Sequence, residues 1–356
     1  MFLKNLENIP LYVSGTKGNG DYIRLSSNEN NYGPSPKVMK VIRKISKFSF
    51  KYPNSSYQEL KEIIAKENNV KPKNIILGNG SDEIFLYLFL IYLSTENSII
   101  TIEKTFTYYK ILAHTVGAKV IESKREANFS ISCKNILNLI SPNTKIIIFP
   151  SPDNPTGVIT SRECIETILK NISKDTLFIL DEAYFQFVPK EKYWNSIELI
   201  EKYPNFIVTR TFSKLYALAG LRIGYGICSQ EISEVYEKIR MPFNISLIAV
   251  ECAKQALLDK EYYQKTLTKI LKDREILEKE LEKLDFEVLK ESYGNFIFCK
   301  GPYGIDNKLF ERKITVRNLE SFGYEKNFYR ITVGTTKENK IFLKTLKEII
   351  KGEKND

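Results

Sequence analysis

The stretch of residues 209–226, TRTFSKLYALAGLRIGYG, contains the side chains of this chain that are best suited to covalent chemistry. Thr211 and Ser213 place two hydroxyls just before Lys214, and Arg222 follows eight residues after that lysine. A lysine in this setting could form a Schiff base with an aldehyde while the hydroxyls and the arginine bind a phosphate. The window could equally be a strand and a turn with a solvated Lys and Arg, so other parts of the chain must decide between the two.

A glycine-rich turn at residues 78–83, GNGSDE, follows an apolar run and opens a predicted helix. Backbone N–H groups at such a helix start form a binding site for an anion. A dinucleotide-binding turn is an alternative, and Glu103 lies about 20 residues further on, as that motif requires. However, Glu83 stands where the motif needs its third glycine. A plain capped helix is the remaining alternative.

Three further polar motifs each follow a predicted apolar strand. Residues 105–109, TFTYY, could offer an aromatic ring for stacking on a planar ligand, or could belong to the core. In residues 151–157, SPDNPTG, two prolines and a glycine favour a rigid loop from which Asn154 could reach a ligand oxygen. Asp181 directly follows TLFIL and needs a cationic partner if buried, either a pyridinium nitrogen or a nearby Lys or Arg.

The elements that position these motifs alternate between strand and helix. We predict strands at residues 74–77, 99–102, 119–123, 145–149, 176–180 and 206–209, and helices at 81–93, 106–116 and 162–171. Strands that are apolar on both faces and separated by helices are typical of a mostly parallel sheet covered on both sides. Ligands of such α/β folds bind at the carboxyl ends of the strands, which is where the polar motifs stand.

The pattern changes after Pro242. Helices are predicted at residues 247–259, 261–284 and 338–350, and short strands at 286–289, 296–299, 314–316 and 330–333. We therefore expect an irregular N-terminal arm (1–27), a large domain (28–245) and a small α+β domain (246–356). The arm is expected to pack with the small domain near the active site.

The composition argues against several classes of function. Lysines are dispersed among glutamates, so the net charge of +10 reads as solvated helix faces and not as a nucleic-acid surface. There is no run of 18 uncharged apolar residues and no signal-like N-terminus, which predicts a soluble protein with no membrane partner. The five scattered cysteines have no C-x-x-C spacing, which indicates reduced thiols in the cytoplasm and neither disulfides nor a zinc site.

The single histidine, His114, limits the possible mechanisms. A mechanism that needs a histidine dyad, a Ser-His-Asp triad or a histidine-ligated metal is therefore nearly excluded. His114 lies in a predicted helical run, where a structural role is expected. Proton transfer must then be carried out by a lysine, a tyrosine or a carboxylate.

Taken together, the motifs resemble those of the fold-type I pyridoxal-phosphate-dependent aminotransferases, and within them the chain is similar to the histidinol-phosphate aminotransferase branch. The resemblance covers nearly the whole chain and rests on SSNENNYGPSP, KYPNSSYQEL, GNGSDE, SPDNPTG, DEAY, RTFSKLYALAGLRIGYG, MPFNIS, ITVR and YRITVG. It implies an α/β fold whose large domain has a mostly parallel, seven-stranded sheet covered by helices, plus a smaller α+β domain.

The resemblance also implies roles for individual residues. Lys214 would hold pyridoxal 5′-phosphate covalently and later move the proton at the substrate Cα. Asp181 would pair with the pyridinium nitrogen, and Tyr184 and Asn154 would bind the phenolic oxygen. Phe106 would stack on the ring, where the family often has tyrosine.

The phosphate of the cofactor would be bound by several main-chain and side-chain groups of one subunit and by Tyr52 of a neighbouring subunit. The groups of the first subunit are those of Gly80, Ser81, Asp82, Thr211, Ser213 and Arg222. This arrangement implies a homodimer with shared active sites.

For the substrate, Arg330 and Arg317 would form an anion clamp with Tyr12 and Asn28 nearby. The implied reaction is reversible amino transfer between L-histidinol phosphate and 2-oxoglutarate in histidine biosynthesis. One partner carries a phosphate and the other carries carboxylates, and two arginines can bind either group.

Three other functions stay open from the sequence. A broad aromatic aminotransferase would use the same scaffold, since a pocket for imidazole also accepts phenyl rings. A threonine-phosphate decarboxylase usually carries an HGGN-type motif near its N-terminus, whereas the comparable loop here reads TKGNG. A basic regulatory protein with an inactive aminotransferase domain is disfavoured by the intact Lys214, Asp181 and Arg222.

Overall fold

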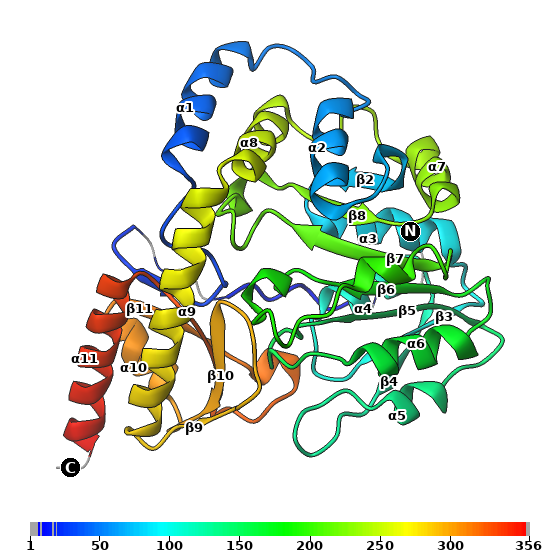
Figure 1. Ribbon diagram of the computed structural model, residues 1–356. Helices are drawn as coiled ribbons and strands as arrows, with labels where there is room; N and C mark the ends of the chain where they lie inside the picture. Colours follow the sequence, from blue (N-terminus) through cyan, green and yellow to red (C-terminus); the bar gives the residue numbers. More distant parts are fainter. Residues whose placement is uncertain (1–5, 8, 16–17, 19, 354–356) are drawn as a thin grey trace.

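The computed structural model describes residues 6–7, 9–15, 18 and 20–353, and the strands of this part form two sheets (Figure 1). One sheet has seven strands in the order β2-β8-β7-β6-β5-β3-β4, and the other has five in the order β1-β11-β12-β10-β9. Residues 1–5, 8, 16, 17 and 19 of the predicted arm, with most of its TKGNG loop, lie outside the described residues.

The seven-stranded sheet is mostly parallel, as expected. Its strands are β2 (Ile75–Gly78), β3 (Ser98–Ile102), β4 (Lys119–Ser123), β5 (Thr144–Pro150), β6 (Leu177–Asp181), β7 (Phe206–Thr211) and β8 (Gly224–Ile227). Strands β7, β6, β5, β3 and β4 pair in parallel, while β8 runs antiparallel to both β7 and β2. All residues of β2, β3, β6, β7 and β8 are buried, which explains their continuous apolar sequences.

Helices cover both faces of this sheet because successive strand residues point to opposite sides. Ile146 and Ile148 of β5 pack in one core with α3 (Ser81–Tyr92), α4 (Tyr108–Thr115) and α7 (Gln230–Ile239). Ile147 and Phe149 pack in the other core with α2 (Gln58–Asn68), α5 (Cys133–Leu137) and α6 (Arg162–Asn171). The alternation along one strand therefore accounts for the three-layer arrangement.

The five-stranded sheet consists of β1 (Ile23–Leu25), β9 (Glu287–Val288), β10 (Phe296–Lys300), β11 (Ile314–Asn318) and β12 (Phe328–Thr332). The helices α9 (Lys260–Glu282) and α11 (Thr336–Glu353) run side by side next to it (Figure 1), and α10 (Ile305–Glu311) precedes β11. Short 3-10 turns occur at Ser46–Phe48, Pro72–Asn74, Phe185–Phe187, Ser196–Leu199, Ala219–Leu221 and Glu320–Phe322.

The predicted arm is not irregular throughout. Its residues Ile23–Leu25 form β1, which pairs in parallel with β11 so that Ile23 lies opposite Ile314. A three-residue strand is too short to show a period of two, and its partner is nearly 300 residues away in the chain. Sequence periodicity could not reveal this pairing.

The boundary between the two predicted domains stays a prediction. Helix α8 (Leu247–Leu258) begins just after it but packs against α1 (Pro36–Ile45) and α2, which precede it. Helices α1 and α8 thus join the two predicted domains. In the described part of the chain, no helix is both long and apolar enough to cross a lipid bilayer.

Candidate active site

A cavity of about 500 Å³ lies at the carboxyl ends of β5, β6 and β7. Residues of the second sheet and of the N-terminal arm also line it. Most of the residues proposed from the sequence line this cavity: Tyr12, Asn28, Ser81, Asp82, Phe106, Asn154, Asp181, Tyr184, Thr211, Ser213, Lys214, Arg222, Arg317 and Arg330. This volume is in the usual range for a small-molecule site.

Asp181 is the last residue of β6 and is buried in the floor of the cavity. The Tyr109 hydroxyl donates a hydrogen bond to Oδ2 (2.7 Å), and the Ala183 amide donates one to Oδ1 (3.1 Å). Burial raises the pKa of Asp181 to about 6, although the bond from Tyr109 acts in the opposite direction. These two described partners are neutral, so a cationic group of a ligand would stabilise the ionised carboxylate.

The sequence left open whether Asp181 forms a salt bridge with a nearby Lys or Arg. In the structure the neighbouring residue Glu182 forms such a salt bridge, with Arg210. Glu182 Oε2 lies 2.7 Å from Arg210 Nη2, and both side chains are almost fully buried. Arg210 also donates to the Tyr193 hydroxyl (3.0 Å). Glu182 therefore has its cation within the protein, which distinguishes it from Asp181.

Lys214 follows β7 and projects into the same cavity. Among the described residues its amine has one hydrogen-bond acceptor, the Ser27 carbonyl at 3.4 Å, and it lies 5.3 Å from the centre of the Tyr184 ring. Thr211 Oγ1 donates to Ser213 Oγ (2.9 Å) and accepts from the Ser213 amide (3.1 Å), which fixes the turn before the lysine. The amine is thus held near a rigid turn without a strong partner of its own.

The N-terminus of α3 forms the end of the cavity that is suited to bind an anion. Among the described residues no side chain caps this helix, whereas serines cap α1, α6, α7 and α8. Arg222 Nη2 lies 3.1 Å from Asp82 Oδ2 at this end. Burial raises the pKa of Asp82, and the charge of Arg222 opposes that effect. Uncapped N–H groups beside a guanidinium are suited to bind a phosphate.

Gly80 does not line the cavity but shapes this end of it. Its φ of +82° favours glycine, and a Cβ there would lie 2.5 Å from Arg222 Nη2. Any larger residue would therefore displace the guanidinium from the helix start.

Two side-chain hydrogen bonds and an aromatic pair lie in the lining of the cavity. Asn28 Nδ2 donates to the Tyr184 hydroxyl (2.9 Å), and Arg330 Nη1 donates to Asn154 Oδ1 (2.5 Å). The Phe106 ring stands edge-to-face against Tyr109, with their centres 5.3 Å apart. Tyr184, Asn154 and Phe106 thus bring a hydroxyl, an amide and an aromatic ring to the lining of one cavity.

Arg317 and Arg330 are directly opposite each other on β11 and β12, and both are buried. Burial lowers the pKa of Arg330 to about 10 and also lowers that of Arg317. In the described part of the structure neither forms an ion pair, since their partners are carbonyls of Val13, Ser14 and Ser26 and neutral side chains. Two facing cations without a carboxylate between them favour the binding of an anion.

Tyr12 reaches the same region from the N-terminal arm. Its ring stands edge-to-face against Phe106 at 6.3 Å. Burial raises the pKa of its hydroxyl, while the charges of Arg330 and Arg317 act against that rise. An anion held by the arginines would therefore be close to a neutral hydroxyl donor.

Some residues of the site were not predicted. Tyr109 could have been found, because it belongs to the TFTYY motif that includes Phe106. Arg24 and Glu29, paired at 2.8 Å, also line the cavity and had no sequence signal. Conversely, Tyr52 lies outside this cavity, with 79% of its surface exposed.

Comparisons with known proteins agree with this geometry. Residues 20–346 match the family model for class I and II aminotransferases. The histidinol-phosphate aminotransferase of Moorella thermoacetica is 34% identical over 334 residues, which cover 93% of this chain and 86% of that protein. That of Pelagibacter ubique is 35% identical and covers 92% of each.

One similar solved structure is that of histidinol-phosphate aminotransferase from Sinorhizobium meliloti in complex with pyridoxal-5′-phosphate. Its TM-score is 0.85 at 25% identity, covering 93% of this chain and 91% of that chain.

Proposed function

The chain belongs to the class I and II aminotransferases, and from that premise we propose that it transfers an amino group reversibly between L-histidinol phosphate and 2-oxoglutarate, using pyridoxal 5′-phosphate. The observation that carries the substrate assignment is the facing pair of buried arginines, Arg317 and Arg330, in the same cavity as Lys214. Relatives with this activity cover nearly the whole chain.

The residues of the cavity fit the cofactor. Its phosphate would bind at the uncapped start of α3 with Ser213 and Arg222, and its ring nitrogen would be held by Asp181. Tyr184 and Asn154 would hold the phenolic oxygen, and Phe106 would lie against the ring face. The phosphate end would be completed by Gly80, Ser81, Asp82 and Thr211. Bound pyridoxal phosphate supplies a protonated pyridine ring that withdraws electrons from the substrate Cα.

Each protein group then has a defined task. The Asp181 carboxylate would keep its negative charge once a cation lies beside it, because an adjacent positive charge opposes the rise in pKa that burial causes. The hydroxyl of Tyr109 strengthens that ionised state by donating to Oδ2. Lys214 would hold the cofactor, and its amine would move the proton at the substrate Cα.

The substrate end must accept two different anions. Arginine side chains present paired N–H donors that match a phosphate and a carboxylate equally well. Arg317 and Arg330 would thus bind the phosphate of histidinol phosphate in one half-reaction and a carboxylate of 2-oxoglutarate in the other. Tyr12 and Asn28 would orient the bound substrate from the arm.

We further propose a homodimer in which Tyr52 of each subunit binds the cofactor phosphate of the other. Tyr52 is exposed, as is Phe50, and the Tyr52 ring stacks on Phe243 at 4.6 Å. An exposed group of aromatic side chains supports a protein interface. The scattered cysteines support a cytoplasmic location.

The proposed function is tested by loading the protein with pyridoxal phosphate, reducing it with borohydride and locating the label by peptide mass spectrometry. We expect a yellow protein, a label on Lys214, and formation of glutamate from histidinol phosphate and 2-oxoglutarate. A protein that takes up no cofactor, or that forms no glutamate from this pair, would refute the proposal.

A further inference from the structure

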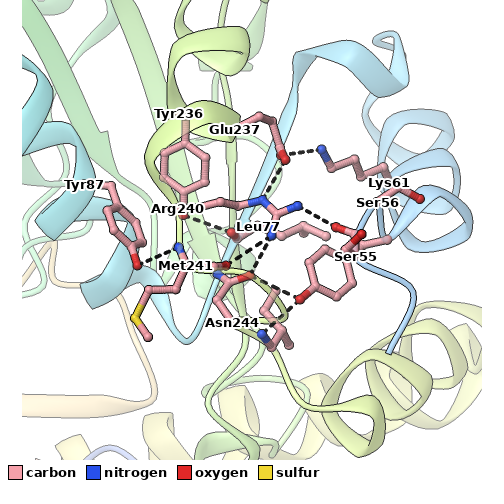
Figure 2. Close-up of polar contacts among 12 residues, drawn as sticks. Ser55, Ser56, Lys61, Leu77, Tyr87, Tyr236, Glu237, Arg240, Met241 and Asn244 are labelled. Atoms are coloured by element: carbon pink, nitrogen blue, oxygen red, sulfur yellow. Dashed lines mark hydrogen bonds and ion pairs between the residues drawn. The ribbon is translucent and has the colours of Figure 1, made fainter. Parts of the chain in front are cut away.

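A continuous set of polar contacts centred on Arg240 connects Ser55 with α7 and with Asn244 (Figure 2). Ser55 lies in the same loop as the exposed Tyr52. Arg240 caps the end of α7, and only 9% of its side chain is exposed. Its guanidinium donates to Glu237 Oε2 (2.6 Å), to Asn244 Oδ1 (3.3 Å) and to the Ser55 carbonyl (2.5 Å). One side chain thus joins α7, the segment after it and the loop before α2.

The loop formed by residues 49–55 depends on these contacts for its position. At the start of the loop, the Lys51 amide donates to the carbonyl of Phe48, which ends the preceding 3-10 turn (2.9 Å). Its contacts with the rest of the protein include the Ser55 carbonyl on Arg240 and the Tyr52 ring stacked on Phe243. Both partners belong to residues 240–244, so that segment determines where Tyr52 points.

Residues 240–245 are themselves firmly held. The Met241 amide donates to the Tyr87 hydroxyl (3.0 Å), and the Ile245 amide donates to the Tyr57 hydroxyl (3.1 Å). Glu237 is fixed as well, because its second oxygen accepts from Lys61 at 2.7 Å (Figure 2). Arg240 therefore projects from a rigid support and not from a mobile turn.

The same network reaches the anion-binding end of the cavity. Asn244 Nδ2 donates to Glu83 Oε2 (2.6 Å), which also accepts from the Asn79 amide (2.7 Å). Asn79 belongs to the glycine-rich turn before α3. The loop that carries Tyr52 and the turn that would bind phosphate are thus attached to one common segment.

We propose that Arg240 is a positioning residue that holds the 49–55 loop so that Tyr52 reaches the cofactor phosphate in a second copy of this chain. This inference rests on the proposed shared-site dimer. Three acceptors at different angles require the planar fork of an arginine, and a lysine keeps the charge but cannot contact all three. Tyr52 lies outside the cavity of its own chain, and Asn244 keeps its bonds to Glu83 and to the Tyr57 hydroxyl when Arg240 is changed. The main effect of changing Arg240 should therefore appear at the partner's site.

Heterodimers with one functional lysine test this directly. Two differently tagged chains are co-expressed, and one of them carries Lys214→Ala, so the absorbance band of lysine-bound cofactor and the turnover both report the site of the other chain. Arg240→Lys is then placed either on the chain with Lys214→Ala or on the chain with the intact lysine. Pyridoxal phosphate is titrated into each purified heterodimer.

The substitution on the chain with Lys214→Ala is expected to raise the cofactor dissociation constant at the intact site about tenfold, which corresponds to one lost hydrogen bond to a charged group. On the chain with the intact lysine it should change that constant less than about twofold. An equal effect in both placements, or a larger effect on the intact chain, would overturn the inference.

Two further variants distinguish a displaced loop from a general loss of stability. Phe243→Ala removes the other support of Tyr52 from a partly exposed position and should show the same dependence on placement. Arg162→Lys changes an arginine that also bonds two carboxylates, Glu166 and Glu198, but on α6, and should have no effect in either placement. Hydrogen exchange without cofactor should be faster in residues 49–57 for Arg240→Lys and for Phe243→Ala, but unchanged for Arg162→Lys.

The failure of the inference is distinguishable from failure of the proposed function. A wild-type protein that sediments as a monomer would overturn the inference while leaving lysine-bound cofactor and glutamate formation intact. A wild-type protein that takes up no pyridoxal phosphate would refute the proposed function itself.

Discussion

Replacing Asp181 by asparagine should make the cofactor-free protein more stable while impairing its activity. Burial raises the pKa of this carboxyl from 3.8 to about 6 in the folded protein. The folded state therefore disfavours the ionised form, and the destabilisation develops as the pH rises from about 4 to 6 and is complete above that range. A shift of roughly two pKa units corresponds to about 3 kcal/mol.

The assay is urea unfolding of the cofactor-free wild type and of Asp181→Asn between pH 4 and pH 8. We expect similar free energies of unfolding at pH 4 and a variant that is more stable by up to about 3 kcal/mol at pH 8. Asp153→Asn is the matched control, since its buried carboxylate lies 2.9 Å from Arg125. That change should destabilise the protein by about 3–5 kcal/mol because it leaves the arginine unpaired.

In the cofactor-loaded enzyme, Asp181→Asn should instead reduce the activity. Without the carboxylate, the ring nitrogen loses its anionic partner, and kcat should fall by roughly two orders of magnitude, the rate equivalent of about 3 kcal/mol. If Asp181→Asn is no more stable than the wild type at pH 8, or if the difference does not change with pH, the account of this buried carboxylate is wrong.

Three other variants test separate parts of the site. Tyr109→Phe removes a hydrogen bond that lowers the pKa of Asp181. As the pH is lowered, the cofactor affinity of this variant should begin to fall at a pH about one unit higher than that of the wild type, and superimposable pH profiles would contradict this. Lys214→Ala should reduce transamination about 10⁴-fold or more and remove the borohydride-sensitive band, so near-normal turnover would disprove its role. Arg330→Lys should raise KM about tenfold or more for both histidinol phosphate and 2-oxoglutarate, since it loses the paired donors, and a change for only one of them would argue against a shared anion clamp.

The sequence predicted the large sheet well because most of its strands are buried on both faces. The runs at 145–149 and 176–180 correspond to β5 and β6 within one or two residues. Since polar motifs follow these strands, the carboxyl edge of the sheet, and with it Asp181 and Lys214, could be located without a structure.

Other elements were missed. Helix α1 was not predicted although the sequence carries its signals, namely the capping serine Ser35, Pro36 in the first turn and the apolar residues Val38, Val41 and Ile42 at helical spacing. Strand β1 depends entirely on pairing with β11.

Contacts between distant residues could not be inferred from spacing. The motif DEAY offers two adjacent carboxylates, and only the structure shows that Arg210 pairs with Glu182 and leaves Asp181 to neutral donors. The facing positions of Arg317 and Arg330 follow from the register of β11 and β12, which a one-residue slip would destroy.

The most direct test of the proposed function compares kcat/KM for histidinol phosphate, phenylalanine and threonine phosphate with the same cofactor-loaded enzyme. The facing arginines and the relatives of this chain predict the highest value for histidinol phosphate, with glutamate as the amino product formed from 2-oxoglutarate. A higher value for phenylalanine, or decarboxylation of threonine phosphate as the preferred reaction, would contradict it.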